Sequence, residues 1–228
     1  MKEARRIVVK VSEYFTGDFQ LDSERLLYRV MTKDDVDDLY RYASDPLVSR
    51  YLTWEAHPSR AYTARYVARV RQAYREGRFF DFALILRENG RMIGTCGLTS
   101  VDEDNRSCEI GYVLSREYWG RGLATEALGT LLAFAFSELG FHRAEVRFMA
   151  DNRASLHVAE KNGMVFEGYR REGLYAKGVF HTIGTASILK REYLARHPAV
   201  TSPCCRATTE KTCEGKRRLF RFLRKHDI

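Results

Sequence analysis

Apolar and polar positions alternate with two different periods along this chain, and these periods divide it into strands and helices. Alternation of period two or a run of β-prone residues predicts a strand, and apolar residues three to four positions apart predict a helix. The predicted strands span residues 25–31, 79–87, 92–98, 107–115, 142–149, 165–169 and 179–189. The predicted helices span residues 32–42, 122–139 and 152–162, and a further helix is predicted to begin at Pro58 or Ser59. This order predicts a mixed α/β domain whose first half is antiparallel.

Turn and cap residues support the boundaries of these elements. Thr32, with acidic residues two and three positions later, suits the N-cap of a helix. Asn89-Gly90 suits the tight turn of a hairpin between two strands, and Gly163 suits the end of a helix. The hydrophobic pattern is therefore interrupted where strands and helices have to change direction.

The predicted elements occupy residues 23–194, which we expect to form one domain. Residues 1–22 precede it as an arm or an extra strand, because residues 6–11 form a short apolar run. Residues 195–228 follow it as a tail in which prolines and scattered polar residues interrupt the pattern. No run approaches the ~20 apolar residues of a membrane span, and no long apolar region follows the basic N-terminus. The five cysteines are odd in number and match no disulfide framework, which favours a cytoplasmic location.

The net charge of +8 is concentrated in the tail. Residues 196–228 contain nine Lys/Arg and three Asp/Glu, a balance of +6, which leaves +2 for the other 195 residues. Residues 216–225 interleave apolar and basic side chains, a pattern that suits RNA, a ribosome or another acidic surface. The alternatives are a helix packed on the domain or a disordered end. The tail residues Cys204, Cys205, Cys213 and His226 have irregular spacing for a metal site, so no metal is expected.

One stretch carries a chemical signal of its own. Tyr118-Trp119-Gly120-Arg121-Gly122-Leu123-Ala124-Thr125-Glu126-Ala127 follows a predicted strand and opens a predicted helix. The free N–H groups at a helix start and the positive end of the helix dipole form an anion site, and glycines let the main chain approach a phosphate closely. The alternative is an ordinary strand-to-helix turn.

Further motifs follow one another in a fixed order from residue 23 to residue 193. They are Ser23-Glu24-Arg25-Leu26, Ser44-Asp45-Pro46, Arg50-Tyr51-Leu52-Thr53-Trp54, Glu109-Ile110-Gly111-Tyr112, the 119–124 loop, Asn152-Arg153-Ala154-Ser155, Glu160-Lys161-Asn162-Gly163-Met164 and Glu167-Gly168. In these motifs the chain resembles the GCN5-related N-acetyltransferase (GNAT) superfamily, in particular the RimJ/RimL-like branch that acetylates the N-termini of ribosomal proteins. The resemblance implies a mixed, largely antiparallel six- to seven-stranded sheet that is flanked by helices and split where acetyl-coenzyme A inserts.

The resemblance also implies which residues contact the coenzyme. Main-chain N–H groups of the loop would hold the pyrophosphate, and pantetheine would run along the edge of strand 107–115. The implied contacts are Tyr112, Val113, Leu114, Trp119, Gly120, Arg121, Gly122, Leu123, Ala124, Thr125 and Asn152. Superfamily members often carry Gln or Arg where this chain has Trp119, a departure that main-chain binding tolerates.

Transfer of an acetyl group to an amine needs a base for the amine and a hydrogen-bond donor for the departing thiolate. Glu109, among apolar neighbours on its strand, is the candidate base, and the alternative is a solvated carboxylate paired with an Arg. The resemblance implies Ser155 as the donor, and the alternative is helix capping. Cys96 and Cys108 are conceivable nucleophiles, but both sit in strand runs where small apolar residues are expected.

The acceptor is predicted to be a protein N-terminal α-amine, and the protein a monomer or homodimer. The resemblance implies that Trp54, His57 and Glu172 border the acceptor mouth, although His57 also fits a polar surface residue. Two rivals stay open. One is an acetyltransferase for a small amine such as an antibiotic, a polyamine or an amino acid, and the other is a non-catalytic acetyl-coenzyme A sensor with an RNA-binding tail.

Overall fold

The computed structural model of this protein describes residues 11–15 and 19–198, and a single sheet of eight strands lies at its centre. The strand order is β1-β2-β3-β4-β5-β6-β8-β7, and every neighbouring pair is antiparallel except the parallel pair β5 and β6. The strands are β1 (Leu21–Asp22), β2 (Leu26–Arg29), β3 (Phe80–Leu86), β4 (Met92–Asp102), β5 (Ser107–Leu114), β6 (Arg143–Met149), β7 (Val165–Ala176) and β8 (Val179–Leu189). The predicted mixed, largely antiparallel fold is confirmed, with eight strands where six or seven were expected.

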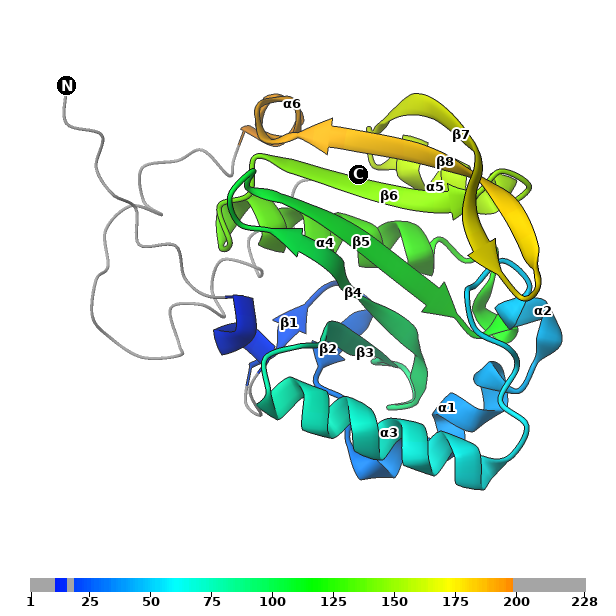
Figure 1. The fold of residues 1–228 in the computed structure, drawn as a ribbon. Helices are drawn as coiled ribbons and strands as arrows, with labels where there is room; N and C mark the ends of the chain where they lie inside the picture. Colours follow the sequence, from blue (N-terminus) through cyan, green and yellow to red (C-terminus); the bar gives the residue numbers. More distant parts are fainter. Residues whose placement is uncertain (1–10, 16–18, 199–228) are drawn as a thin grey trace, which may run out of the picture.

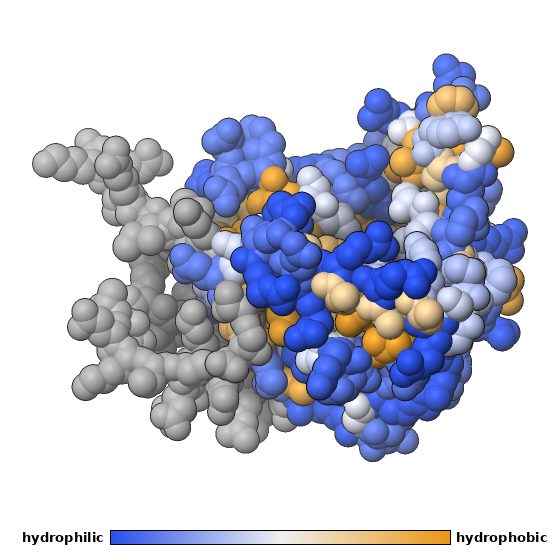
Figure 2. Space-filling view, turned by 60° about the horizontal axis from the view of Figure 1, so that its bottom comes forward, coloured by the Kyte–Doolittle hydropathy of each residue, from blue (hydrophilic) through white to orange (hydrophobic). Residues whose placement is uncertain are grey.

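Within the described residues, six α-helices and three 3-10 helices flank the sheet. They are α1 (Val36–Ala43), α2 (Pro46–Ser49), α3 (Arg60–Arg75), α4 (Leu123–Ser137), α5 (Arg153–Lys161), α6 (Lys190–Arg196), η1 (Val11–Phe15), η2 (Lys33–Asp35) and η3 (Arg116–Tyr118). Helices α1 and α3 cover one face of the sheet, and α4 and α5 cover the other (Figure 1). Seen from the side of α1 and α3, the surface is mostly hydrophilic with apolar areas between the polar groups (Figure 2). None of the helices in the described segments is long and apolar enough to cross a membrane.

All predicted strands and helices from residue 25 onward are present. Thr32 caps η2 as expected, because its hydroxyl accepts from the N–H of Asp34 at 3.3 Å. Strands β4 and β7 are longer than predicted, and the short elements β1, α2 and α6 were missed. The expected strand over residues 6–11 falls outside the described residues except for Val11, which begins η1.

Part of the expected N-terminal arm belongs to the core. Phe15 in η1 is 1% exposed, and its ring centroid lies 4.3 Å from that of Phe82 on β3. Tyr14 contacts Phe134 of α4 edge to face, with 5.1 Å between the ring centroids. Leu21 of β1 is also 1% exposed. The boundary predicted at residue 22 therefore lies inside the packed unit, because burying these large apolar side chains is strongly favourable.

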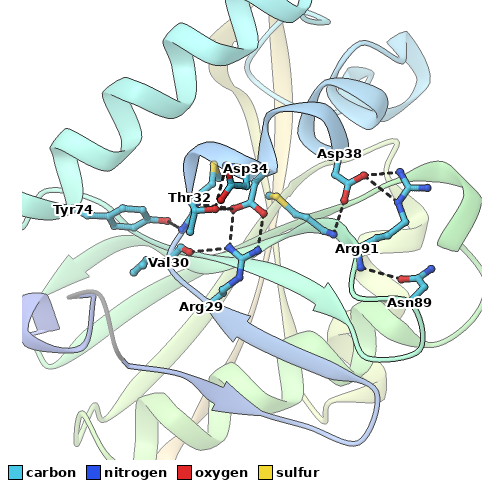
Figure 3. Close-up of polar contacts among 11 residues, drawn as sticks. Arg29, Val30, Thr32, Asp34, Asp38, Tyr74, Asn89 and Arg91 are labelled. Carbon is cyan, nitrogen blue, oxygen red and sulfur yellow. Dashed lines mark hydrogen bonds and ion pairs between the residues drawn. The ribbon is translucent and has the colours of Figure 1, made fainter.

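Carboxylates fasten the helical layer of α1 and α3 to the sheet (Figure 3). Asp35 at the end of η2 accepts two hydrogen bonds of 2.7 Å from the guanidinium of Arg29 on β2. Asp38 in α1 accepts from the Arg91 side chain and, at 3.0 Å, from the N–H of Met92 at the start of β4. Charge-assisted bonds of this kind fix geometry well, so they hold this layer firmly against the sheet.

The sheet splits between β5 and β6. Their parallel pairing spans three positions and ends at Glu109 and Glu145, whereas β5 continues to Leu114 and β6 to Met149. The two strands diverge beyond the paired positions (Figure 1). The expected split is therefore present, with open strand edges on both sides.

Alternation along β5 decides which groups approach this split from which face. Ile110 and Tyr112 point to the α4–α5 face, where Ile110 is 1% exposed. Glu109 and Gly111 point to the opposite face, where α1 packs against the neighbouring strand β4. Groups on both faces of the sheet can thus reach the same opening.

Candidate functional site

The loop before α4 has the backbone geometry expected of an anion site. Gly120 and Gly122 have φ angles of +74° and +75°, which glycine adopts without the strain that a side chain brings. Gly122 is the N-cap of α4 and supplies no side-chain cap. Within the described part of the chain, no group accepts a hydrogen bond from the main-chain N–H groups of residues 121–125. These donors, at the positive end of the α4 dipole, fit the pyrophosphate of coenzyme A.

A carboxylate in the first turn of α4 braces this loop. Glu126 accepts from the Ser23 hydroxyl, from the N–H of Arg25 and from the Arg25 guanidinium, at 2.7 Å in each case. The same guanidinium donates to the carbonyl of Arg121 at 2.8 Å. The motif at residues 23–26 is therefore a support of the loop. Sequence reasoning singled out both segments but missed their link, since 101 positions separate Arg25 from Glu126.

Trp119 ties the loop to the end of β5. Its indole N–H donates to the carbonyl of Leu114 at 2.9 Å, and the residue is 50% exposed. Because this N–H is already engaged, the ring can contact a coenzyme only through its faces and edges. Leu123 is 2% exposed, so its side chain is buried in the core and does not face a ligand.

The other expected contacts in the loop and on β5 lie along one path. Val113 and Leu114 end β5, and Ala124 and Thr125 belong to the first turn of α4. The structure thus brings the open edge of β5 and the anion site together.

Glu109 lies at the last paired position of β5, and its side chain is 20% exposed. Arg147 on β6 donates to Oε2 at 3.3 Å, so the arginine partner considered from the sequence is present. In the described residues, Oε1 has no hydrogen-bond partner in protein. The carboxylate is therefore oriented by Arg147 and keeps one oxygen for a proton or a water.

The candidate donor Ser155 lies in the first turn of α5. Its N–H donates to the side-chain oxygen of Asn152 at 3.2 Å, so Asn152 is the cap and the capping interpretation of Ser155 is wrong. The Ser155 hydroxyl lies 2.9 Å from the hydroxyl of Tyr112, and the carbonyl oxygen of Ser155 lies 3.2 Å from the same phenol oxygen. Burial raises the pKa of Tyr112 above its ordinary value, so the phenol stays protonated.

His57 is 7% exposed, so its interpretation as a surface residue is wrong. Its Nδ1 lies 2.8 Å from the hydroxyl of Thr63, and its ring packs against Trp54 and Tyr66 with centroid distances of 5.5 and 5.4 Å. Burial lowers the pKa of His57, which favours the neutral imidazole. The structure brings Trp54 and His57 together in the loop before α3.

A hollow of about 520 Å³ opens at the carboxyl end of β6. Met149, one of its lining residues, follows Arg147 by two positions and so lies on the same face of β6 as Arg147, the partner of Glu109. Lys177, in the turn between β7 and β8, donates to the carbonyl of Ser49 and bridges the hairpin to α2. The residues that line the hollow are Arg50, Tyr51, Met149, Ala150, Asp151, Phe180, His181 and Thr182.

Glu172 lies beside this hollow. It has a φ of +50° where the pairing of β7 with β8 is interrupted between Arg170 and Leu174. Its N–H donates to the hydroxyl of Thr182, a lining residue, at 3.4 Å. Of the three predicted acceptor-mouth residues, Glu172 thus adjoins the hollow, whereas the lining residues Arg50 and Asp151 were not among the predicted site residues. No periodicity marks these two, because Arg50 follows a four-residue helix and Asp151 lies in the turn after β6.

The cysteines of the domain are poor nucleophiles. Cys96 and Cys108 are 0% and 3% exposed. Burial raises the pKa of Cys108 to about 12 and that of Cys96 well above its ordinary range, so both remain thiols. No cluster of three or more His, Cys, Asp or Glu side chains in the described segments could hold a metal ion. The cysteines and His226 of the tail lie outside those segments.

Comparison with known proteins agrees with this geometry. A family profile described as "Acetyltransferase (GNAT) domain" matches residues 25–165. The chain is 34% identical over 173 residues to the "Uncharacterized N-acetyltransferase p20" of Bacillus licheniformis, which covers 76% of this chain and 97% of that protein. It is 30% identical over 175 residues to the "Putative ribosomal N-acetyltransferase YdaF" of Bacillus subtilis, which covers 75% and 94%. A solved GNAT acetyltransferase from Bacillus anthracis superimposes with a TM-score of 0.68 at 25% identity, covering 76% of this chain and all of the other.

Relatives with other acceptors in their names also match. The spermidine N(1)-acetyltransferase of Vibrio cholerae is 27% identical over 105 residues, which covers 46% of this chain and 61% of that protein. Similarity alone therefore leaves the acceptor amine undetermined.

Proposed function

We propose that this chain, which belongs to the GNAT family of acetyl-coenzyme A-dependent N-acetyltransferases, acetylates the N-terminal α-amine of a protein. One observation carries the proposed chemistry: Glu109 and Ser155 approach the split between β5 and β6 from opposite faces of the sheet. A thioester held in the split is then open to a base on one side and to a hydroxyl donor on the other.

The coenzyme is bound from the loop inward. The N–H groups of residues 121–125 hold the pyrophosphate, and pantetheine follows the open edge of β5 past Val113 and Tyr112. Asn152 fixes the start of α5, which presents the Ser155 hydroxyl to the sulfur. The fit of these groups to one extended thioester supports this assignment.

In the proposed reaction the amine attacks the thioester carbonyl directly within a ternary complex. A C–N bond forms, the C–S bond breaks, and the electron pair of that bond goes to sulfur. Glu109 takes one proton from the amine through a water, and the released thiolate takes one proton from solvent, so the exchange balances. Ser155 donates a hydrogen bond to the departing thiolate. The buried thiols Cys96 and Cys108 argue against an acyl-enzyme.

The composition of the hollow favours a protein N-terminus over a polyamine. Its lining contains one acidic side chain, Asp151, and one basic side chain, Arg50. A polyamine carries several ammonium groups and needs several carboxylates to replace their hydration. An α-amine, with a pKa of ~7.7–8.0, is far easier to deprotonate at neutral pH than a lysine side chain at ~10.4. One carboxylate, Glu109, suffices for that task.

The test is a competition among three acceptors. Two peptides share one sequence with a single lysine, one with a free and one with an acetylated N-terminus, and spermidine is the third. We expect the free peptide to give the highest kcat/KM for thiol release, with the acetyl group on its α-nitrogen by mass spectrometry. A higher kcat/KM for the blocked peptide or for spermidine would replace this assignment with the lysine or small-amine alternative. Absence of thiol release with all three would favour the non-catalytic sensor.

A further inference from the structure

We propose that Tyr112 is a positioning residue whose hydroxyl orients the Ser155 hydroxyl toward the sulfur of the thioester. The inference rests on the proposed role of Ser155 as hydrogen-bond donor to the departing thiolate. It gives Tyr112 a task beyond lining the pantetheine path.

The geometry gives Ser155 very little freedom. Its N–H donates to the side-chain oxygen of Asn152 at 3.2 Å, and its carbonyl oxygen lies 3.2 Å from the Tyr112 hydroxyl. The same Tyr112 hydroxyl lies 2.9 Å from the Ser155 hydroxyl oxygen, the sole hydrogen-bond partner of that oxygen among the described residues. Tyr112 itself comes from β5, three positions beyond the last β5–β6 pair at Glu109. One phenol group therefore joins the open edge of β5 to the first turn of α5, across the split.

The direction of the hydrogen bond follows from the geometry around the two hydroxyls. The phenol has a single hydrogen, and the Ser155 hydroxyl oxygen at 2.9 Å is nearer to it than the Ser155 carbonyl at 3.2 Å, so Tyr112 donates chiefly to the Ser155 hydroxyl. The Ser155 hydrogen, which otherwise rotates freely, is then left to point at a third atom. A sulfur in the split supplies that atom when negative charge develops on it. Hydrogen bonds in such a chain strengthen one another, so the donor power of Ser155 rises when it is needed.

Tyr112 does not act as the acid in this arrangement. Burial of Tyr112 disfavours loss of the phenolic proton, as the raised pKa of Tyr112 indicates. The phenol keeps its proton through the reaction, and the proton balance between amine and sulfur is unchanged. Its effect is exerted entirely through Ser155.

A double-mutant cycle tests the inference with the full chain, acetyl-coenzyme A and a peptide acceptor. The variants are Tyr112→Phe, Ser155→Ala and their combination. We expect Tyr112→Phe to lower kcat about three- to tenfold, the range for one neutral hydrogen bond, with KM for acetyl-coenzyme A unchanged. In the Ser155→Ala background the same change should lower kcat less than twofold. Tyr74→Phe is the matched control, because it removes a buried hydroxyl that donates to the carbonyl of Asp81 far from the split.

The outcomes separate this inference from its premise. A Ser155→Ala variant with wild-type kcat would remove the proposed role of Ser155 itself. A slow Ser155→Ala variant in which Tyr112→Phe has its full effect would leave that role intact and overturn the positioning of Ser155 by Tyr112. A rise in KM for acetyl-coenzyme A at unchanged kcat would also overturn it, because Tyr112 would then act in coenzyme binding alone.

Discussion

Replacing Gly122 with Asp should nearly abolish binding of coenzyme A, whereas replacing it with Asn should weaken binding much less. Steric clash does not cause this difference, because a Cβ atom at Gly122 would meet nothing closer than the Arg25 guanidinium at 3.6 Å. The φ of +75° strains both side chains alike, and Asp and Asn tolerate this region best among non-glycine residues. Each variant should lose about 1 kcal/mol of folding free energy from this strain.

The difference between the two variants is then one negative charge at the phosphate site. At about 6 Å and an effective dielectric constant of about 40, each phosphate charge costs roughly 1.4 kcal/mol. Two pyrophosphate charges therefore cost about 2–3 kcal/mol, which is roughly a 30- to 150-fold loss of affinity for the Asp variant relative to the Asn variant. Because the charges are near the surface, the gap should narrow as salt is added.

Isothermal titration calorimetry with coenzyme A at low and high salt measures this gap directly. Gly140→Asp is the control for added charge and for strain, since Gly140 has a φ of +73° with open space around it, beyond the opposite end of α4. It should bind coenzyme A as the wild type does. Equal affinities for the Asp and Asn variants, in folded proteins, would mean that the pyrophosphate does not lie at this helix start.

Two further predictions concern carboxylates on the α1–α3 side of the sheet. Glu109→Gln should lower kcat/KM at pH 7 by ~10²–10⁴-fold, and the rate of the variant should recover partly toward pH 9, where the α-amine loses its own proton. A wild-type rate at pH 7 would leave Glu109 only a structural role beside Arg147. Burial raises the pKa of Asp81 to about 7, and Oδ1 of Asp81 has no hydrogen-bond partner among the described residues. The native state therefore holds a proton that the unfolded chain releases near pH 4, so stability falls as the pH rises from about 4 to 7. Asp81→Asn should raise the free energy of unfolding by about 1–2 kcal/mol at pH 8 and by less at pH 5. Urea titrations that show no increase in the free energy of unfolding at pH 8 would contradict this reasoning.

The hydrophobic pattern predicted the sheet and the main helices well because each spans several periods. It missed β1, α2 and α6, which have two, four and seven residues, too few to establish a period. The extension of β7 was missed for another reason. Its pairing with β8 is interrupted between Arg170 and Leu174, and the polar residues and glycine there break the alternation. The burial of Phe15 depends on contacts with Phe82 and Tyr74, which lie far away in the sequence.

The candidate site was predictable where a single segment builds it and unpredictable where distant segments meet. The proposed anion loop needs only two glycines and a helix start, which the sequence alone could predict. The brace from Arg25 to Glu126, the pairing of Arg147 with Glu109 and the contact of Tyr112 with Ser155 each join residues tens of positions apart. The hydrophobic pattern cannot predict such contacts. The spacing of apolar residues shows which face of an element is buried, but it does not show which element packs against that face.

The parity of positions on β5 nevertheless links the pattern to the proposed chemistry. Glu109 and Tyr112 are three positions apart, an odd number, so strand alternation must send them to opposite faces. In a continuous sheet this would separate them, because the backbone layer would lie between their side chains. Here the pairing of β5 with β6 stops at Glu109, and the edge beyond it is open. A thioester in that opening can be reached by Glu109 from one face and by Ser155, held by Tyr112, from the other. An inserted residue between Glu109 and Tyr112 would turn both groups to one face, which is why the spacing itself, and not only the residue types, supports the proposed site.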